Sequence, residues 1–101
     1  MDANGYSASI MDTEAGTCFI CGAHRETIRH EVFYGPNRST SKKHGFWVNI
    51  CPVPWCHQDI HTHAIIMGED IDLRLKRMVQ SEYEREHTRE EFMQLIGRSY
   101  L

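Results

Sequence analysis

The chain has 101 residues, of which 41% are hydrophobic and 25% are charged, and its formal net charge at pH 7 is −3. This composition predicts one small folded domain and argues against a disordered chain. Apolar runs are short and no basic segment followed by an apolar stretch opens the chain, so neither a transmembrane helix nor a secretory signal is expected. A Walker loop and a dinucleotide fingerprint are also absent, which excludes the common nucleotide-binding folds. We therefore expect a cytoplasmic protein without a membrane partner.

The charges are unevenly distributed along the chain. The segment from Arg25 to His44 has five basic and two acidic residues, whereas the segment from Ala64 to Leu101 has six basic and eight acidic residues. This distribution is consistent with a basic patch on an otherwise acidic body, although a solvated loop gives the same composition. The negative total charge counts against a dedicated nucleic-acid binder.

The first half of the chain predicts a tail followed by two strands. Residues 1–15 are small and polar without periodicity, so we expect a mobile tail in front of a single domain over residues 16–101. Thr27 to Tyr34 is rich in β-branched and aromatic residues and predicts a strand. Residues 35–41 have the composition of a loop, and Phe46 to Ile50 predicts a second strand.

The second half predicts helices. A first helix is expected from Cys56 to about Ile66, with Pro54 near its entrance. Apolar residues then recur at the spacing of one helix face: Ile71, Leu75, Met78, Val79 and Tyr83. A capping-box signature predicts a last helix from about Arg89 to Ile96. The order of elements predicts an α+β fold, a hairpin plus a metal-rich helix followed by two C-terminal helices. A homodimer through these last helices would cover apolar surface that so short a chain leaves exposed.

Four cysteines form the first cluster with chemical meaning: Cys18, Cys21, Cys51 and Cys56. The first two have the C-x-x-C-G spacing of a zinc knuckle, and four thiolates around one ion make a closed, structural site. Two disulfides would fit a secreted chain, and a thioredoxin-like redox pair would need a βαβ pattern that is absent here. By spacing alone, His57 could replace Cys56 as the fourth ligand.

Histidines form the second cluster. His57 and His61 are four residues apart, so on a helix their imidazoles share one face and can hold one divalent ion, although such pairs are often merely solvated. His63 points elsewhere on an ideal helix. If the hairpin folds against this helix, His30 on the first strand faces the ion, and a neutral imidazole is a suitable general base for water.

These residues resemble the HNH, or ββα-metal, endonucleases. His30, a loop, a second strand and the pattern C-x4-C-H-x3-H at residues 51–61 carry the likeness. Two longer stretches look like those of short phage or prophage proteins of HNH type, namely H-E-V-F-Y-G-P-N-R-S-T-S-K-K-H-G at residues 30–45 and R-E-E-F-M-Q-L-I-G-R-S-Y-L at residues 89–101. The resemblance covers most of residues 18–101.

The resemblance implies a small zinc-stapled ββα-metal fold and a metal-dependent DNA endonuclease or nickase acting in the host bacterial cytoplasm. It assigns the general base to His30 and the ligands of a catalytic Mg²⁺, or another divalent ion such as Mn²⁺ or Ni²⁺, to His57 and His61. Asn49 would hold the loop of the base, and Arg38, Lys42 or Lys43 would clamp flanking phosphates of the DNA. The structural zinc would be bound by the cysteines: Cys18, Cys21, Cys51 and Cys56.

Two positions depart from the family pattern. Arg29 stands where the family commonly has a further metal ligand, and Asn49 lies only two residues before Cys51, so Asn37 is another candidate for its role. The second hypothesis is therefore a non-catalytic zinc-containing module that binds nucleic acid. The third is an interaction module that binds a phage or host protein through its acidic helices.

Overall fold

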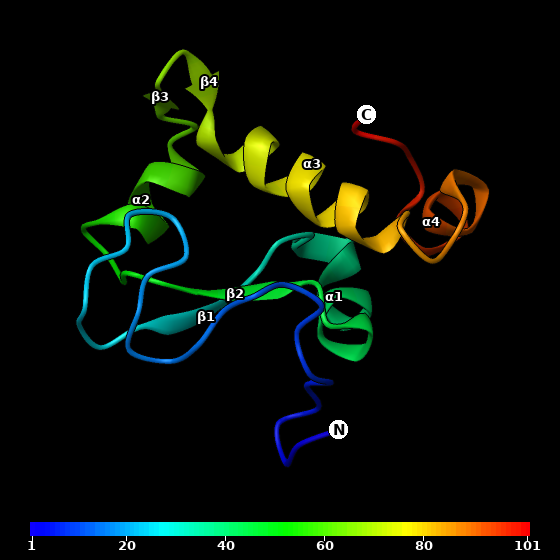
Figure 1. Ribbon diagram of the computed structural model, residues 1–101, viewed down its shortest axis with the longest axis horizontal. Coiled ribbons are helices and arrows are strands. Elements are labelled where there is room, and N and C mark those ends of the chain that lie inside the picture. Colours follow the sequence, from blue (N-terminus) through cyan, green and yellow to red (C-terminus); the bar gives the residue numbers. More distant parts are fainter.

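The computed structural model describes all 101 residues and has the expected α+β architecture (Figure 1). It contains two antiparallel hairpins, four α-helices and one short 3-10 helix. The elements in chain order are β1 (Ile28–Glu31), the 3-10 helix (Gly35–Asn37), α1 (Arg38–His44), β2 (Trp47–Ile50), α2 (Cys56–His61), β3 (Ile65–Ile66), β4 (Glu69–Asp70), α3 (Ile71–Tyr83) and α4 (Arg89–Ile96). No helix combines the length and the apolar character that a bilayer span requires.

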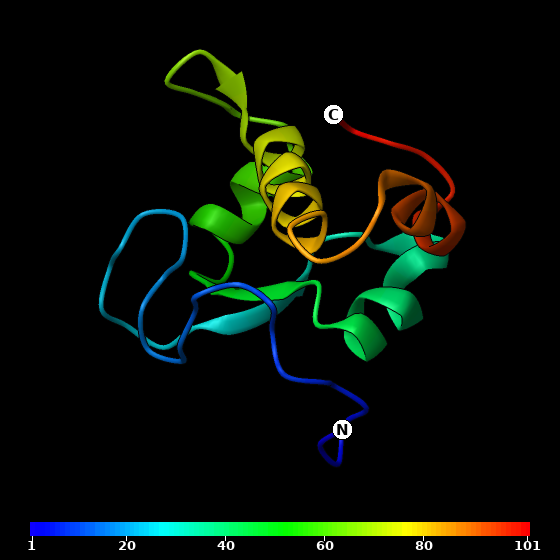
Figure 2. The ribbon, with the colours of Figure 1, turned by 45° about the vertical axis from the view of Figure 1, so that its right-hand side comes forward.

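The register of the first hairpin decides which side chains face the helices. His30 of β1 pairs with Val48 of β2, and Arg29 pairs with Asn49. Because side chains alternate along a strand, His30 and Val48 share the face that is buried under α2 and α3, whereas Arg29 and Asn49 lie on the other face. Figure 2 shows α2 and α3 on one side of this hairpin and the start of the chain on the opposite side.

An aromatic cluster joins α4 and the end of α3 to the hairpin. Phe33, Phe46 and Phe92 are almost completely buried, and the Phe33 ring lies 5.7 Å from that of Phe46 and 5.4 Å from that of Phe92. Tyr83 at the end of α3 adds an edge-on contact to Phe46, with ring centroids 5.5 Å apart. Pairs at these separations stabilise a core beyond the area that they bury.

The two C-terminal helices agree with the sequence prediction because their signals are local. The side chain of Asp70 accepts hydrogen bonds from the backbone at the start of α3, and Thr88 and Glu91 form the reciprocal capping box of α4. Gly97 ends α4 in the left-handed conformation, with a φ of 101°.

The expected loop over residues 35–41 is wrong. The 3-10 helix and α1 occupy this segment, with Pro36 in the first turn, where its missing N–H is not needed. The buried hydroxyl of Ser41 accepts a hydrogen bond from the Phe33 amide and donates one to the Phe33 carbonyl, which fixes α1 against the end of the hairpin. The Pro and Ser residues of this segment therefore serve a helix start and a buried contact rather than a loop.

The helix that begins at Cys56 ends at His61 instead of continuing to about Ile66. His63 has a φ of 53°, which no regular right-handed helix contains, and the chain then turns back through β3 and β4. Gly68 supports this second hairpin with a φ of 83°.

The start of the chain is packed against the hairpin, so the expectation of a mobile tail over residues 1–15 is corrected. The Ser7 amide donates to the Lys42 carbonyl at 2.9 Å, the Ile10 amide donates to the Gly45 carbonyl at 3.0 Å, and the Trp47 indole N–H donates to the Ser7 carbonyl at 2.8 Å. These contacts use backbone groups, which small polar side chains in the sequence do not reveal.

Gly45 is the position that permits this packing. It has a φ of 75° after α1, and a Cβ there would overlap the carbonyl oxygen of Ala8. We expect Gly45→Ala to lower the free energy of unfolding by about 1–3 kcal/mol from backbone strain alone, and further because residues 1–10 are displaced. Gly68→Ala is the matched control, since its φ is also positive but no atom lies within 4 Å of the added Cβ. Urea denaturation and limited proteolysis should show the larger effect at Gly45, and equal effects would contradict this role for the Ala8 contact.

Candidate metal centres

The four cysteines come together at one point. The Sγ atoms of Cys18 and Cys56 lie 3.7 Å apart, those of Cys21 and Cys51 lie 3.6 Å apart, and all four lie within 4.8 Å of one another. Zn–S bonds of about 2.3 Å in a tetrahedron place the sulfurs about 3.8 Å apart, so these separations fit one ion. All four are free thiols, and the fourth position is filled by Cys56 rather than His57. The group therefore has the arrangement of a closed structural site.

Backbone amides favour the thiolate form of Cys18, which is the form that binds a metal. The amides of Cys21 and Cys51 both donate to the Cys18 sulfur at 3.4 Å. Burial disfavours the Cys18 thiolate, but these hydrogen bonds outweigh it and lower the pKa of Cys18 to about 6. Burial raises the pKa of Cys56, and the neighbouring Cys18 raises it further. A bound cation would overcome this cost, because metals bind the deprotonated thiolate.

Three imidazoles form a second group, with His30 from β1 and His57 and His61 from α2. The ring of His30 lies 5.8 Å from that of His57 and 5.9 Å from that of His61, and the Nε2 atoms of His57 and His61 are 3.0 Å apart. One ligand atom from each histidine lies within 4.8 Å of the ligand atoms of the other two. The hairpin and the helix thus bring together the three histidines that the sequence singled out.

The donor atoms of this group fit a divalent cation. Two imidazole nitrogens 3.0 Å apart can both reach an ion at the usual distance of about 2.1 Å. The Nε2 atom of His30 is buried and has no hydrogen-bond partner within the protein, which is uncommon for a buried polar atom. Burial, and then the neighbouring His57 and His61, lower the pKa of His30 to about 4, so this imidazole is neutral at neutral pH. A neutral imidazole is able to bind a metal or accept a proton.

The two centres are adjacent in the chain. Cys56 and His57 are consecutive residues at the start of α2, and the His57 amide donates to the Cys51 carbonyl at 3.0 Å. The buried Cys56 side chain belongs to the cysteine group, whereas the His57 ring beside it lies 5.8 Å from the ring of His30 on the hairpin. An ion on the cysteines would therefore hold the histidine group in place.

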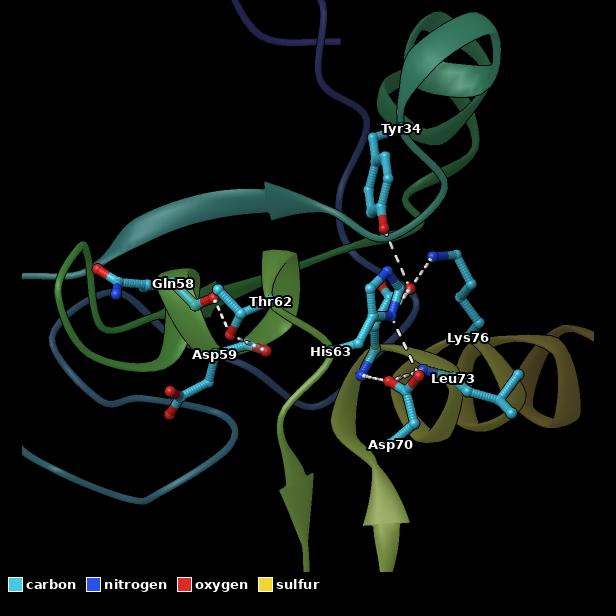
Figure 3. A network of polar contacts seen from close by, with 9 residues as sticks. Tyr34, Gln58, Asp59, Thr62, His63, Asp70, Leu73 and Lys76 are labelled. Atoms are coloured by element: carbon cyan, nitrogen blue, oxygen red, sulfur yellow. Dashed lines mark hydrogen bonds and ion pairs between the residues drawn. The ribbon is translucent and has the colours of Figure 1, made fainter.

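A buried polar network lies beside the histidines and was not predicted. The Tyr34 ring is 5.3 Å from that of His61, and its hydroxyl donates to Asp72 at 3.0 Å. The Lys76 ammonium donates to the same carboxylate at 2.6 Å and lies 4.2 Å from the centre of the Tyr34 ring. Figure 3 shows Tyr34, Lys76 and His63 converging from three different segments. The only sequence signal was the i, i+4 spacing of Asp72 and Lys76, which is ordinary on an exposed helix.

His63 lies outside the helix that holds His57 and His61, because α2 ends at His61 and the chain turns at His63. Its Nδ1 atom lies 3.1 Å from Asp70 and 3.7 Å from Asp72. Together these residues form a third group of potential metal ligands. The Lys76 ammonium already compensates the buried Asp72 carboxylate, so this group is better described as an ionic network that joins the end of α2 to the start of α3.

The structure does not bring Asn49 or Arg38 to the histidines. The Asn49 amide lies on the opposite face of the hairpin, 3.4 Å from the Thr13 hydroxyl. The Arg38 guanidinium is exposed and pairs at 2.8 Å with Glu31, which shares that opposite face. Asn37, the other candidate for the role of Asn49, donates instead to the Ile96 carbonyl at the end of α4.

Both centres are built from segments that lie far apart in the sequence. The cysteine group joins residues 18–21 to residues 51–56, and the histidine group joins β1 to α2. Comparison of the chain with protein-family models, with curated proteins and with solved structures finds no match.

Proposed function

We propose that the protein is a metal-dependent DNA endonuclease or nickase of the HNH type. The observation that carries this proposal is the convergence of His30, His57 and His61 between a hairpin and a helix, with the buried Nε2 atom of His30 left without a partner. The resemblance of residues 30–61 to HNH endonucleases supports the same assignment. A phage-encoded protein of this kind would act on DNA in the cytoplasm of its bacterial host.

In this proposal the histidines have two roles. His57 and His61 hold one divalent ion, which when bound supplies polarisation of the scissile phosphate and stabilisation of the leaving oxygen. His30 accepts the proton of the attacking water. Its low pKa keeps the imidazole unprotonated at neutral pH, which is the form that accepts a proton. The Tyr34 ring lies against both His30 and His61 and limits the movement of the two imidazoles.

The donor set also bears on the identity of the ion. Mg²⁺ prefers oxygen ligands, whereas imidazole nitrogens suit transition metals. The protein ligands proposed here are nitrogens only. We therefore propose that Mn²⁺ or Ni²⁺ supports the reaction at lower concentration than Mg²⁺ does.

A plasmid-nicking assay tests the proposal. Supercoiled plasmid is incubated with the zinc-loaded protein and Mg²⁺, Mn²⁺ or Ni²⁺, and relaxed circles are counted. His30→Ala is expected to reduce the nicking rate by about 100-fold or more, while the bound zinc stays unchanged. His87→Ala, which removes an exposed imidazole outside the cluster, is the control and should cut normally. Unchanged cutting by His30→Ala would show that this residue is not the base, and loss of the second ion from that variant would make it a ligand instead.

A non-catalytic zinc-containing module that binds nucleic acid or a protein is the second candidate. The placement of Asn49 and Arg38 on the hairpin face opposite to His30 favours it, because two of the expected site residues are then absent from the histidine group. The nicking assay, combined with a measurement of DNA binding, separates the two functions. If the protein binds DNA but nicks it with none of the three ions, the non-catalytic module is the correct function.

A further inference from the structure

A shallow hollow of about 500 Å³ lies between the start of the chain, β1 and α1. Its lining residues are Asn4, Tyr6, Ile28, Arg29, Arg38 and Lys42. Three of the six are cationic and none is acidic, although the whole chain has a net charge of −3. Arg29 belongs to the hairpin face that points away from His30, so this hollow is separate from both metal centres.

The cations of the hollow keep unused hydrogen-bond donors. One guanidinium nitrogen of Arg29 forms an ion pair with Asp2 at 2.7 Å, and one of Arg38 forms an ion pair with Glu31 at 2.8 Å. Each guanidinium has five N–H donors, so most of them are left for a ligand. Lys42 makes no ion pair at all, and its ammonium lies 4.8 Å from the centre of the Tyr6 ring. The two carboxylates compensate two of the three positive charges, which leaves one positive charge uncompensated.

Aromatic contacts hold one of these cations in place. The Arg29 guanidinium lies over the rings of Tyr6 and Trp47, at 4.6 Å and 4.8 Å from their centres. The Tyr6 hydroxyl donates to Glu31 at 2.9 Å, and its ring meets that of Trp47 edge-on at 5.7 Å. A donor that is already fixed loses less entropy when a ligand binds. These contacts distinguish the hollow from a set of freely moving surface side chains.

We propose that this hollow binds a phosphate group. Guanidinium donors match phosphate oxygens in pairs, and the ammonium of Lys42 supplies the uncompensated charge. The proposed function makes the backbone of DNA the expected source of this phosphate, and to that extent the inference rests on it. A free phosphate ion or a mononucleotide presents the same chemistry, so the experiment separates these sources.

The test compares two adjacent lysines of α1. Lys42→Gln and Lys43→Gln remove the same charge from the same helix, but only Lys42 lines the hollow. Binding of a labelled DNA oligonucleotide is followed by fluorescence anisotropy on the zinc-loaded full chain without added catalytic ion. Lys42→Gln is expected to weaken binding about 5- to 10-fold and to reduce the slope of log K against log salt by about one. Lys43→Gln should change the affinity less than about 2-fold.

Competition identifies the source of the phosphate and completes the test. Inorganic phosphate and a mononucleotide, each at constant ionic strength, compete with the oligonucleotide in the wild type. Competition at millimolar concentration assigns the hollow to free phosphate compounds, and its absence assigns it to the DNA backbone. Equal losses in the two lysine variants, or no loss in Lys42→Gln, would overturn the proposal. Because nicking is not measured, the result stands independently of the endonuclease activity, which the plasmid assay tests separately.

Discussion

Cys51→Ser is expected to abolish metal binding at the four-cysteine centre and, with it, cooperative folding of the domain. The ion would join residues 18–21 to residues 51–56, and structural zinc contributes about 10–16 kcal/mol of apparent binding free energy in small zinc-binding peptides. The whole stability of a small domain is about 5–15 kcal/mol. Loss of this ion therefore removes a contribution as large as the net stability.

Metal content and urea denaturation followed by circular dichroism measure this effect. Chelation of the wild-type protein should reproduce the behaviour of Cys51→Ser, and added zinc should restore the chelated wild type but not the variant. The four-cysteine assignment would be refuted by a fully metal-free protein that unfolds cooperatively at the same urea concentration as the zinc-loaded one.

Asp72→Ala is expected to cost about 3–5 kcal/mol, because it leaves the Lys76 ammonium buried without a compensating charge. The Lys76 and Asp72 side chains are only 10% and 6% exposed, and the carboxylate is also the acceptor for the Tyr34 hydroxyl. The expected signature is a lower urea midpoint at an unchanged denaturant dependence. The ring of Tyr34 would then be held less firmly against His61.

A second variant distinguishes the cost of an uncompensated buried charge from the cost of lost packing. Asp72→Ala combined with Lys76→Met removes both charges, and it should recover most of the lost stability. Asp59→Ala is the matched control, since Asp59 lies in a helix but makes no side-chain hydrogen bond or ion pair, and it should change stability by less than about 0.5 kcal/mol. A cost below about 1 kcal/mol for Asp72→Ala would contradict the role of the ion pair.

The sequence predicts those parts of the fold whose signals are local. The apolar spacing from Ile71 to Tyr83 and the capping box at Thr88 define α3 and α4 closely. The spacing of the cysteines also identifies their cluster, because a C-x-x-C-G knuckle is specific in itself. The packing of residues 1–10 and the Asp72 network escape prediction, since both depend on contacts between segments that lie 30 or more residues apart.

Asn49 shows how the register of the hairpin decides which residues lie on the same face as His30. The strand that contains it was expected, but His30 pairs with Val48, so the neighbouring Asn49 must face the other side of the hairpin. The sequences of the two strands do not by themselves determine this pairing register. His30, by contrast, lies opposite α2 because the buried face of the hairpin also contains Val48 and Ile50.

The direct succession of Cys56 and His57 has a consequence for how the protein would load its ions. Any shift of the first helical turn moves a ligand of each centre at once, so the two binding equilibria are thermodynamically linked. Linkage is reciprocal: if zinc on the thiolates raises the affinity of the histidine site for its ion by some factor, an ion on the histidines raises the affinity of the thiolates for zinc by the same factor. Oxidation of Cys21, the exposed member of the thiol group, would then weaken ion binding at the histidines without any contact between the oxidant and an imidazole.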